Sequence, residues 1–595
     1  PALLHVLIFA DEVAIPAAAE RYCRDCNEAQ ARVLAQELGA AIRARDFGAA
    51  SQKKAEEYHA LCPHGELYEL LAAEAALARG DVAAAVDFAE AAYAKRRMSA
   101  DTHRLMYRIC YAAEEYDRAM QFLVLSKGQD DILYPHDAQV RIAFFRKLSA
   151  AVSDTRFAPF LKVFYIEEGQ MRTRTQALVG ETLPRFSEEL PVYWTGIYNP
   201  YGQICIKDKV LDLMNEKTVE YGLPIYNDFP FDVMKAEERA EIRAASVDGV
   251  PVLLPIAAKD AGQILRFSNE HLDRTMLLSK GEFNFYRVED AVTVTSETPF
   301  AVGAPIVLRH SPQRRKLVLN ILADGFSWKE MQWGHCALVP RILRFFGQGV
   351  IFDNSFSTAE YTYPALSSIE TGLYQHHTQI AKPGTPFAIP QTYTTLSEQM
   401  KRLGYYCVNI QGDAEGIYNG ATRGFDRLIV NHWISRAADG VERTIRHLEA
   451  FDECDNFLFM HFTDAHPYNA DMSTPIGGQT HLPLTDVLQE QDTSASVFLK
   501  PNPLSQYVNR SEIRAVDRQL GYLFDYLTEH YEEDEYLVLL YSDHGASVHA
   551  RSPYLMSEEQ TGAALMVRGA GVPALGRVDE LTSSVDIYKI LGKLA

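Results

Sequence analysis

The chain has 595 residues, a net charge of −21, 47% hydrophobic residues and 23% charged residues. This length exceeds what one hydrophobic core supports, so we expect roughly two to four domains with an ordinary globular composition. The acidic excess argues against nucleic acid or an anionic membrane surface as the main partner. Because no run of about 18 or more apolar residues occurs, we also expect no membrane span.

The eight cysteines are scattered along the chain, which favours free thiols in a reducing compartment and therefore a cytoplasmic location. The apolar start has no basic residues before it and fits a helix or strand of a folded domain better than a secretory signal. Cys23 and Cys26 form a Cys-x-x-Cys pair that could bind zinc together with Cys62 and His64. Without a second well-spaced pair, ordinary helix cysteines are the favoured interpretation.

Residues 1–150 are predicted to form an α-helical domain. Its Ala-rich amphipathic helices come in pairs, one pair turning at residues 79–81 and another at residues 114–116. Pairs of this length resemble tetratricopeptide-type repeats. A plain helical domain is the alternative. Either form predicts a scaffold that binds a protein partner and has no chemistry of its own.

Residues 151–315 differ in pattern and are predicted to form a small β-rich linking domain. Aromatic residues and prolines appear, and residues 283–308 alternate and are rich in Val, Thr and Phe. From residue 316 to residue 595, apolar strand-like runs alternate with helical stretches, which predicts an α/β layered domain.

Four segments of this last domain combine an apolar run or a helix start with polar residues. Two of them are the run at residues 317–323, which ends at Asp324 and Gly325, and the helix start around Thr362. Pro364 suits the first turn of a helix, so Thr362 is expected just ahead of unsatisfied backbone N–H groups. A hydroxyl there can attack phosphorus, although capping the helix is the simpler role for a threonine.

The other two segments are apolar runs that end in His and Asp residues. Residues 456–460 lead into His461, Asp464 and His466, and residues 536–541 lead into Asp543 and His544, with His549 five residues further on. Ligands at the carboxyl ends of strands meet at one edge of an open α/β sheet. Mixed carboxylate and imidazole sets suit Zn²⁺ or Mn²⁺.

Together these motifs resemble the alkaline phosphatase superfamily, in its sulfatase-like branch. The order strand–Asp–Gly, Thr-x-Pro and Ser-Asp-His-Gly carries the resemblance over residues 316–595. It implies a mostly parallel central sheet between helices. It also implies that Thr362 is the nucleophile and that one divalent metal, Zn or Mn, is bound by Asp324, Thr362, Asp543 and His544. A second metal or the substrate's phosphate would then be held by Asp464, His466 and His549, with His466 and His549 also catalytic.

Within the branch, the threonine separates this chain from sulfatases that use a Cys/Ser-x-Pro-x-Arg motif. Here the corresponding residues are Thr362, Pro364 and Leu366, so the formylglycine route is not expected. Residues 460–468, 507–517 and 549–561 are similar to motifs of the phosphoethanolamine and phosphoglycerol transferases. Those enzymes have Glu where this chain has Asp324, and they are membrane-anchored, unlike the expectation for this chain.

The prediction is therefore a metal-dependent phosphodiesterase or phosphotransferase that forms a phospho-threonine intermediate. Its substrate would be a phosphate ester, for which a glycan-linked or a lipid-linked form is an open option. The loop at residues 412–427, with Asn419, Arg423 and Asp426, is expected to contribute to the acceptor pocket. Two alternatives are a sulfate ester hydrolase and a non-catalytic scaffold acting through the helical repeats.

Overall fold

The computed structural model describes residues 29–97, 99–127, 152–153, 160–167, 170–183, 191–200, 230–380, 388–411, 420–431, 435–467, 474–488, 498–551 and 556–595. Two compact units are present: Pro1–Val152 with Val163–Thr173, and Ser153–Lys162 with Arg174–Ala595. The predictions for Cys23, Cys26 and Asn419 lie outside the described residues.

The first unit contains a series of helices joined by short turns. They are α3 (Ala29–Ala44), α4 (Ala49–Leu61), α5 (Leu67–Ala78), α6 (Val82–Lys95), α7 (Ala100–Ala112) and α8 (Tyr116–Lys127). The side chain of Asp81 accepts a hydrogen bond from the Ala84 amide and so caps α6, and Ser99 caps α7 in the same way. The predicted helical region is confirmed; its protein partner stays a prediction.

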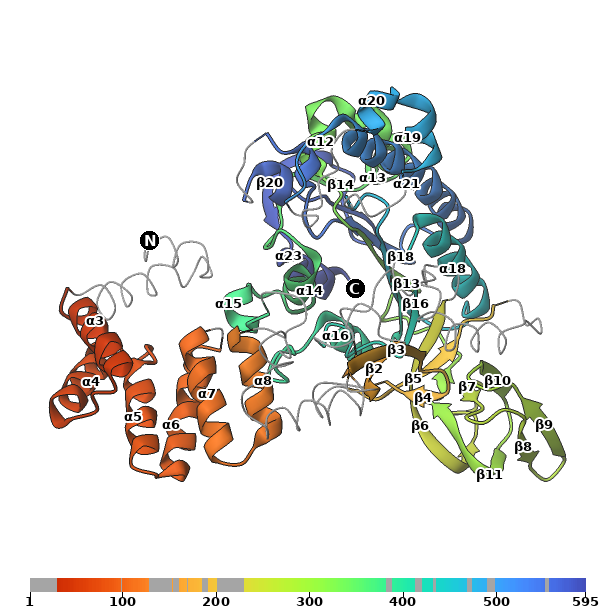
Figure 1. The fold of residues 1–595 in the computed structure, drawn as a ribbon. Helices are drawn as coiled ribbons and strands as arrows, with labels where there is room; N and C mark the ends of the chain where they lie inside the picture. Colours follow the sequence, from red (N-terminus) through yellow and green to blue (C-terminus); the bar gives the residue numbers. More distant parts are fainter. Residues whose placement is uncertain are drawn as a thin grey trace. The chain divides into compact units, whose positions relative to one another are not determined.

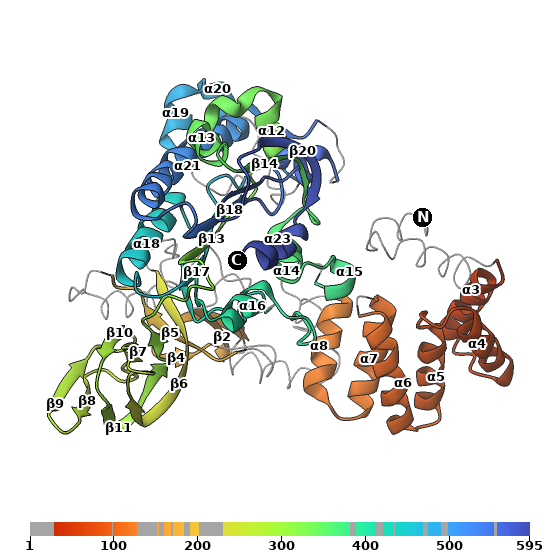
Figure 2. The same cartoon turned by 180° about the vertical axis from the view of Figure 1, so that it is seen from behind.

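A mixed sheet forms the centre of the second unit (Figures 1 and 2). Its parallel strands lie in the order β16 (Arg427–Val430), β15 (Tyr406–Gln411), β17 (Asn456–Phe462), β13 (Leu317–Ala323) and β18 (Tyr536–Tyr541). Beyond β18 follow the antiparallel β19 (Leu565–Gly569), then β14 (Val350–Phe356) and β20 (Gly576–Ser583). Nearly continuous apolar runs, such as residues 317–323 with Asn320 as the one polar residue, are typical of strands covered on both faces.

Helices cover both faces of this sheet, as Figures 1 and 2 show. One face carries α13 (Pro340–Phe346), α18 (Ala437–Ala450) and α21 (Pro503–His530), and the other α14 (Thr362–Thr371), α16 (Leu396–Leu403) and α23 (Asp586–Leu594). The shorter helices are α12 (Trp328–Glu330), α15 (Gln375–Thr378), α19 (Ile476–His481), α20 (Leu484–Val487) and α22 (Glu558–Thr561). This is the predicted α/β fold class. Among the described helices, none has the length and hydrophobicity that crossing a membrane requires.

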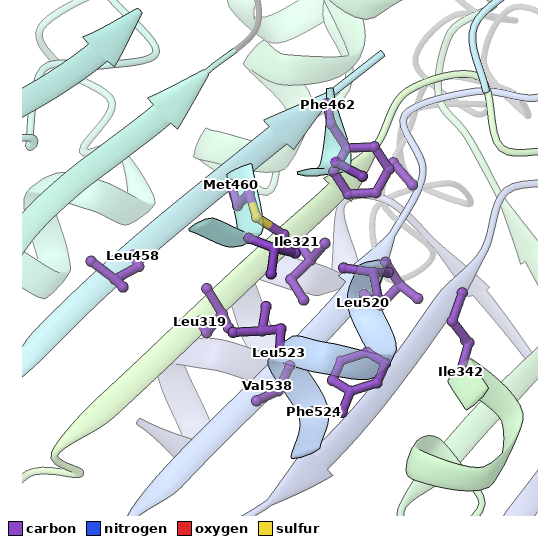
Figure 3. Close-up of a cluster of buried hydrophobic side chains, with 14 of the residues drawn as sticks. Leu319, Ile321, Ile342, Leu458, Met460, Phe462, Leu520, Leu523, Phe524 and Val538 are labelled. Atoms are coloured by element: carbon purple, nitrogen blue, oxygen red, sulfur yellow. The ribbon is translucent and has the colours of Figure 1, made fainter. Parts of the chain in front are cut away.

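The core on the α21 side is built from alternate residues of the strands. Leu319, Ile321 and Met460 point toward Leu520 and Leu523 of α21, and all five side chains are fully buried (Figure 3). Burying a leucine side chain contributes roughly 1.5–3 kcal/mol. This packing fixes the strands whose carboxyl ends carry the polar residues considered below.

The linking segment contributes strands to two sheets. Its strands are β1 (Val152–Ser153), β2 (Phe160–Glu167), β3 (Gln170–Ala177), β4 (Glu181–Thr182), β5 (Tyr193–Ile197), β6 (Phe231–Ala244), β7 (Val252–Ala257), β8 (Gln263–Ser268), β9 (Asp273–Leu278), β10 (Phe283–Val288), β11 (Val292–Gly303) and β12 (Ile306–Val307). The first part of β6 pairs with β5 and β16 of the central sheet, and the rest pairs with β11. The β-rich part is therefore joined to the α/β part through one strand.

Candidate active site

Strand register brings the carboxyl ends of β13, β17 and β18 to one edge of the sheet. Ala323 lies opposite Phe462, and Leu322 lies opposite Tyr541. Asp324 directly follows β13, Asp543 follows β18 after Ser542, and His461 is the penultimate residue of β17. Three distant segments therefore deliver their polar side chains to the same place.

Asp324 lies at the centre of the resulting cluster, and both of its carboxylate oxygens contact other members. Its Oδ2 atom accepts a hydrogen bond from Thr362 Oγ1 at 3.2 Å and lies 3.1 Å from His461 Nε2. Its Oδ1 atom lies 3.3 Å from His544 Nε2 and 3.8 Å from His466 Nε2. The structure thus brings most of the predicted catalytic and metal-binding residues together.

The two turns that carry these carboxylates depend on glycine. Gly325 has φ +68, and a Cβ atom there would lie 3.1 Å from the Cα of His466. The Gly325 amide donates to Asp543 Oδ1 at 3.2 Å, which ties the two strand ends together. A Cβ atom on Gly545 would lie 1.9 Å from the carbonyl oxygen of Glu559, so this position also admits only glycine.

Thr362 is the first residue of α14, as the position of Pro364 in the first turn predicts. Tyr361, the residue before the helix, has extended backbone angles and makes no side-chain cap. The Thr362 hydroxyl instead points to Asp324, away from the capping role. It therefore lies where the amino-terminal N–H groups and the helix dipole favour an anionic group.

The charged groups of this cluster shift one another's pKa values. Burial pushes the pKa of Asp324 upward, but the imidazoles of His466, His461 and His544 hold it below its ordinary value. Burial and the neighbouring Asp324 carboxylate raise the pKa of Asp543. Burial opposes protonation of His544, but the two carboxylates outweigh it and raise its pKa. A concentrated positive charge is what this site stabilises best.

The donor set fits a divalent metal ion. Asp324 Oδ1, Asp543 Oδ2 and His544 Nε2 are buried without hydrogen-bond partners, an arrangement that is costly unless a cation or proton is shared among them. His544 Nδ1 lies 2.7 Å from the carbonyl oxygen of Gly545, so Nδ1 carries a proton and Nε2, which faces the carboxylates, is the atom that would bind a metal ion. One ligand atom each from Asp324, His466 and His544 lies within 4.8 Å of the others.

His466 and Asp464 point in different directions although they are two residues apart. The His466 side chain is 14% exposed, compared with 2% for His544, and so it is the imidazole of the cluster most open to a substrate. Asp464 Oδ2 accepts a hydrogen bond from the Ala437 amide at 2.8 Å, at the start of α18. Burial raises the pKa of Asp464 to about 6. In this structure Asp464 therefore caps a helix.

His549 lies in a separate network. Its Nε2 atom is 2.7 Å from Asn509 Oδ1, and its Nδ1 atom is 3.6 Å from Glu330 Oε1. Burial lowers the pKa of His549 to about 4, so the ring is neutral. Arg510 Nη2 lies 2.6 Å from the same Glu330 oxygen, and a metal ion there would meet the guanidinium. The neutral His549 ring is thus held in place by Asn509 and lies beside Glu330.

Glu330, Asn509 and Arg510 are the residues of this site that sequence reasoning missed. Asn509 Nδ2 donates to the carbonyl oxygen of Ala465, so it links His549 to the loop that carries His466. Glu330 follows Asp324 by six residues, beside a π-helical turn, Met331–His335. Asn509 and Arg510 lie within residues 507–517, the segment similar to a transferase motif, but no role was assigned to them. For Glu330 the one signal is the π-turn, because π-turns often occur at functional sites.

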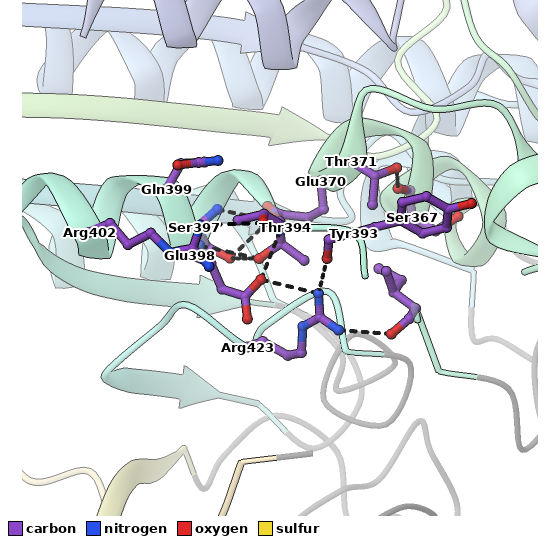
Figure 4. Close-up of polar contacts among 12 residues, drawn as sticks. Ser367, Glu370, Thr371, Tyr393, Thr394, Ser397, Glu398, Gln399, Arg402 and Arg423 are labelled. Atoms are coloured by element: carbon purple, nitrogen blue, oxygen red, sulfur yellow. Dashed lines mark hydrogen bonds and ion pairs between the residues drawn. The ribbon is translucent and has the colours of Figure 1, made fainter. Parts of the chain in front are cut away.

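The described part of the 412–427 loop contacts α16, through Arg423 with Glu398 and Asp426 with Lys401. Arg423 is buried and donates to the carbonyl oxygens of Ile389 and Tyr393 and to Glu398 (Figure 4). Asp426 accepts from the Cys407 amide and pairs with Lys401. Both side chains hold the backbone of this region in place, and their expected role in an acceptor pocket stays a prediction.

Comparison with known proteins gives one family match, and it covers the last part of the chain. Residues 316–595 match the Sulfatase family model. No curated protein sequence matches the chain.

Three solved structures illustrate the likeness. A phosphonate monoester hydrolase from Silicibacter pomeroyi is 18% identical, with 46% of this chain and 72% of that chain covered and a TM-score of 0.37. A putative sulfatase from Bacteroides fragilis is 15% identical, with coverages of 48% and 75% and a TM-score of 0.36. An alkaline phosphatase superfamily protein from Vibrio parahaemolyticus is 15% identical, with coverages of 47% and 67% and a TM-score of 0.34.

Proposed function

We propose that the sulfatase-family domain at residues 316–595 is a metal-dependent enzyme that cleaves phosphate esters with Thr362 as its nucleophile. The observation that carries this proposal is the hydrogen bond from Thr362 Oγ1 to Asp324, inside a buried group of partnerless ligand atoms. A threonine that only capped α14 would not need two buried carboxylates beside it.

The metal ion, Zn²⁺ or Mn²⁺, would be held by Asp324, Thr362, Asp543 and His544. When bound, it supplies positive charge that favours the alkoxide of Thr362 and the developing charge on the phosphoryl oxygens. His461 lies 3.1 Å from Asp324 Oδ2 and orients that carboxylate. His466 is the candidate for a second metal ion or for the substrate's phosphate, because it is the most open imidazole of the group.

The reaction would run in two displacements. In the first, a bond forms between Thr362 Oγ and phosphorus while the bond from phosphorus to the leaving alcohol breaks. The N–H groups at the start of α14 receive the phosphoryl oxygens, and His466 faces the leaving group. In the second, a water oxygen bonds to phosphorus while the bond from phosphorus to Thr362 Oγ breaks; the phosphate product leaves, and Thr362 Oγ takes up a proton from the water to regenerate the hydroxyl. A hydroxyl acceptor in place of water would make the same site a transferase for a phosphoethanolamine- or phosphoglycerol-like group.

A second candidate is the hydrolysis of sulfate esters. The match of residues 316–595 to the Sulfatase family model favours it. Thr362 weighs against it, because threonine cannot be converted to the aldehyde that the resembling sulfatases use. Phosphate is therefore the first substrate class to test.

The test compares an aryl phosphodiester, an aryl phosphomonoester and an aryl sulfate as substrates for the full chain supplied with Zn²⁺ or Mn²⁺. We expect the fastest turnover with a phosphate ester, abolished in Thr362→Ala and partly kept in Thr362→Ser, which preserves a hydroxyl. Circular dichroism checks that each variant folds.

Full activity of Thr362→Ala would refute the nucleophile assignment. Faster cleavage of the sulfate than of both phosphate esters would establish the second candidate. Absence of bound metal and of all activity after metal is restored would instead support a scaffold that acts through its helices.

A further inference from the structure

A cavity of about 270 Å³ lies at the edge of the central sheet where the parallel strands begin. Its lining includes Tyr406, the first residue of β15, and Asp455, which precedes β17. Asp324 follows the opposite end of β13, whose seven residues extend over about 23 Å. The cavity is therefore separate from the metal-ligand cluster.

The lining of this cavity, called the basic cavity below, has an excess of positive charge. Its charged side chains comprise two carboxylates, Asp426 and Asp455, and four basic groups, Lys235, Arg309, Arg314 and Lys401. This excess of basic over acidic side chains contrasts with the net charge of −21 of the whole chain. Local positive charge in an acidic protein concentrates small anions.

Both carboxylates already have basic partners. Asp455 accepts from Arg314 Nε at 2.7 Å and lies 2.8 Å from His310 Nδ1. Asp426 lies 2.8 Å from Lys401 Nζ. Arg314 and Lys401 are thus largely neutralised, and the surplus belongs to the other two basic groups.

Lys235 and Arg309 have no carboxylate partner among the described residues. Lys235 Nζ donates to the carbonyl oxygen of Arg423 at 2.6 Å, which leaves two of its three N–H donors for other acceptors. Burial lowers the pKa of Lys235, and the nearby Asp426 carboxylate offsets this only in part. The Arg309 guanidinium makes no hydrogen bond or ion pair within the described part of the chain.

Apolar groups complete the lining. Pro255, Pro305, Ile306 and Tyr405 are among the lining residues. A free oxyanion would leave this surface uncovered, whereas a ligand with an anionic head and a small organic body would contact both parts.

We propose that the basic cavity binds a small organic anion through Lys235 and Arg309. The head group would be a phosphate, sulfate or carboxylate that accepts from the guanidinium and the ammonium, and the body would lie against the prolines and Tyr405. The site is independent of the proposed reaction at Thr362, and nothing about it requires a metal ion.

The test measures binding of a hexose phosphate, of inorganic phosphate and of the uncharged hexose to the full chain by isothermal titration calorimetry. We expect the hexose phosphate to bind, with a Kd raised at least about tenfold by Arg309→Ala and by Lys235→Met. The matched control is Arg243→Ala, which removes an exposed arginine of β6 outside the cavity and should leave the Kd within about twofold.

The comparison of ligands tests the chemistry of the site. Tighter binding of hexose phosphate than of inorganic phosphate, with no binding of the hexose, supports an organic anion. Equal Kd values in wild type and Arg309→Ala would overturn the proposal, because the anion would then bind elsewhere, the metal-ligand cluster included. No binding of either phosphate at millimolar concentration would overturn it as well. Thermal unfolding identifies any variant that fails to fold. Because Arg309 is exposed, Arg309→Ala is expected to fold like wild type.

Discussion

Replacing Glu370 by glutamine should remove a pH-dependent penalty on the stability of the α/β unit. Glu370 lies on α14, the helix that begins at Thr362, and is 3% exposed. Its Oε2 atom accepts from the Ser397 amide at 3.1 Å and from Ser397 Oγ at 2.9 Å (Figure 4). Burial outweighs these hydrogen bonds and raises the pKa of Glu370 from 4.5 to about 7.

The size and sign of the effect follow from proton linkage. Below about pH 4.5 both folded and unfolded chains keep the Glu370 proton, and there is no penalty. Between 4.5 and 7 only the unfolded chain releases it, so the free energy of unfolding falls as the pH rises. At about 1.4 kcal/mol for each pH unit, the loss reaches about 3 kcal/mol above pH 7.

The assay is thermal unfolding of wild type and Glu370→Gln at pH 5 and pH 8. Glutamine keeps an oxygen that can accept both hydrogen bonds from Ser397 but carries no charge. For a unit of about 400 residues, 3 kcal/mol corresponds to roughly 4 °C in Tm. We therefore expect the variant to gain roughly 4 °C relative to wild type at pH 8, with a much smaller gain at pH 5.

An exposed glutamate provides the matched control. Glu580 is exposed on β20, and Glu580→Gln should leave the difference in Tm between the two pH values unchanged. If Glu370→Gln shows the same pH dependence as wild type, folding does not change the pH at which Glu370 loses its proton, and the reasoning from its burial is wrong.

Three further substitutions probe the site and its support. Asp324→Asn removes a charge from the metal-ligand cluster and should lower metal affinity by at least about 100-fold, measured as metal retained after dialysis; unchanged metal content would contradict the ligand assignment. Asn509→Ala frees both His549 and the carbonyl oxygen of Ala465 and should lower kcat by about tenfold; an unchanged kcat would separate this network from catalysis. In the wild type the buried Asp232 carboxylate lies 2.6 Å from Arg427 Nη2. Arg427→Met removes this partner and should lower the free energy of unfolding, measured by chemical denaturation, by about 3–5 kcal/mol. A cost under about 1 kcal/mol would mean that the carboxylate finds another partner or a proton.

The central cluster was predictable because strand register is a strong constraint. Apolar runs such as residues 317–323 indicate strands buried on both faces, and parallel strands put their carboxyl ends at one edge. Asp324, Asp543 and His544 each follow such a run within three residues. So few residues after the end of a strand leave the backbone little conformational freedom. The position of these residues in the sequence therefore nearly determines their position in space.

Prediction weakens as the distance from the strand increases. Asp464 and His466 both follow β17, yet one accepts from the Ala437 amide and the other faces Asp324. The backbone angles of the turn decide this, and no single residue in the sequence reveals them. His549 is further still from β18, and the short helical turn Ser547–His549 directs it to Asn509.

The strand β6 shows why the sequence predicted β structure in the linking segment but not its connection to the α/β part. The alternation at residues 283–308 indicates strands, yet the strand that pairs with a given edge depends on residues far away in the chain. One signal was present: Asp232 is a charged residue within an apolar run, and it is 2% exposed because Arg427 of β16 pairs with it. A buried charge requires a counter-charge from a neighbouring element. The Asp232–Arg427 pair therefore specifies which edge β6 joins, and the same junction brings Lys235 next to Asp426 and so forms the basic cavity.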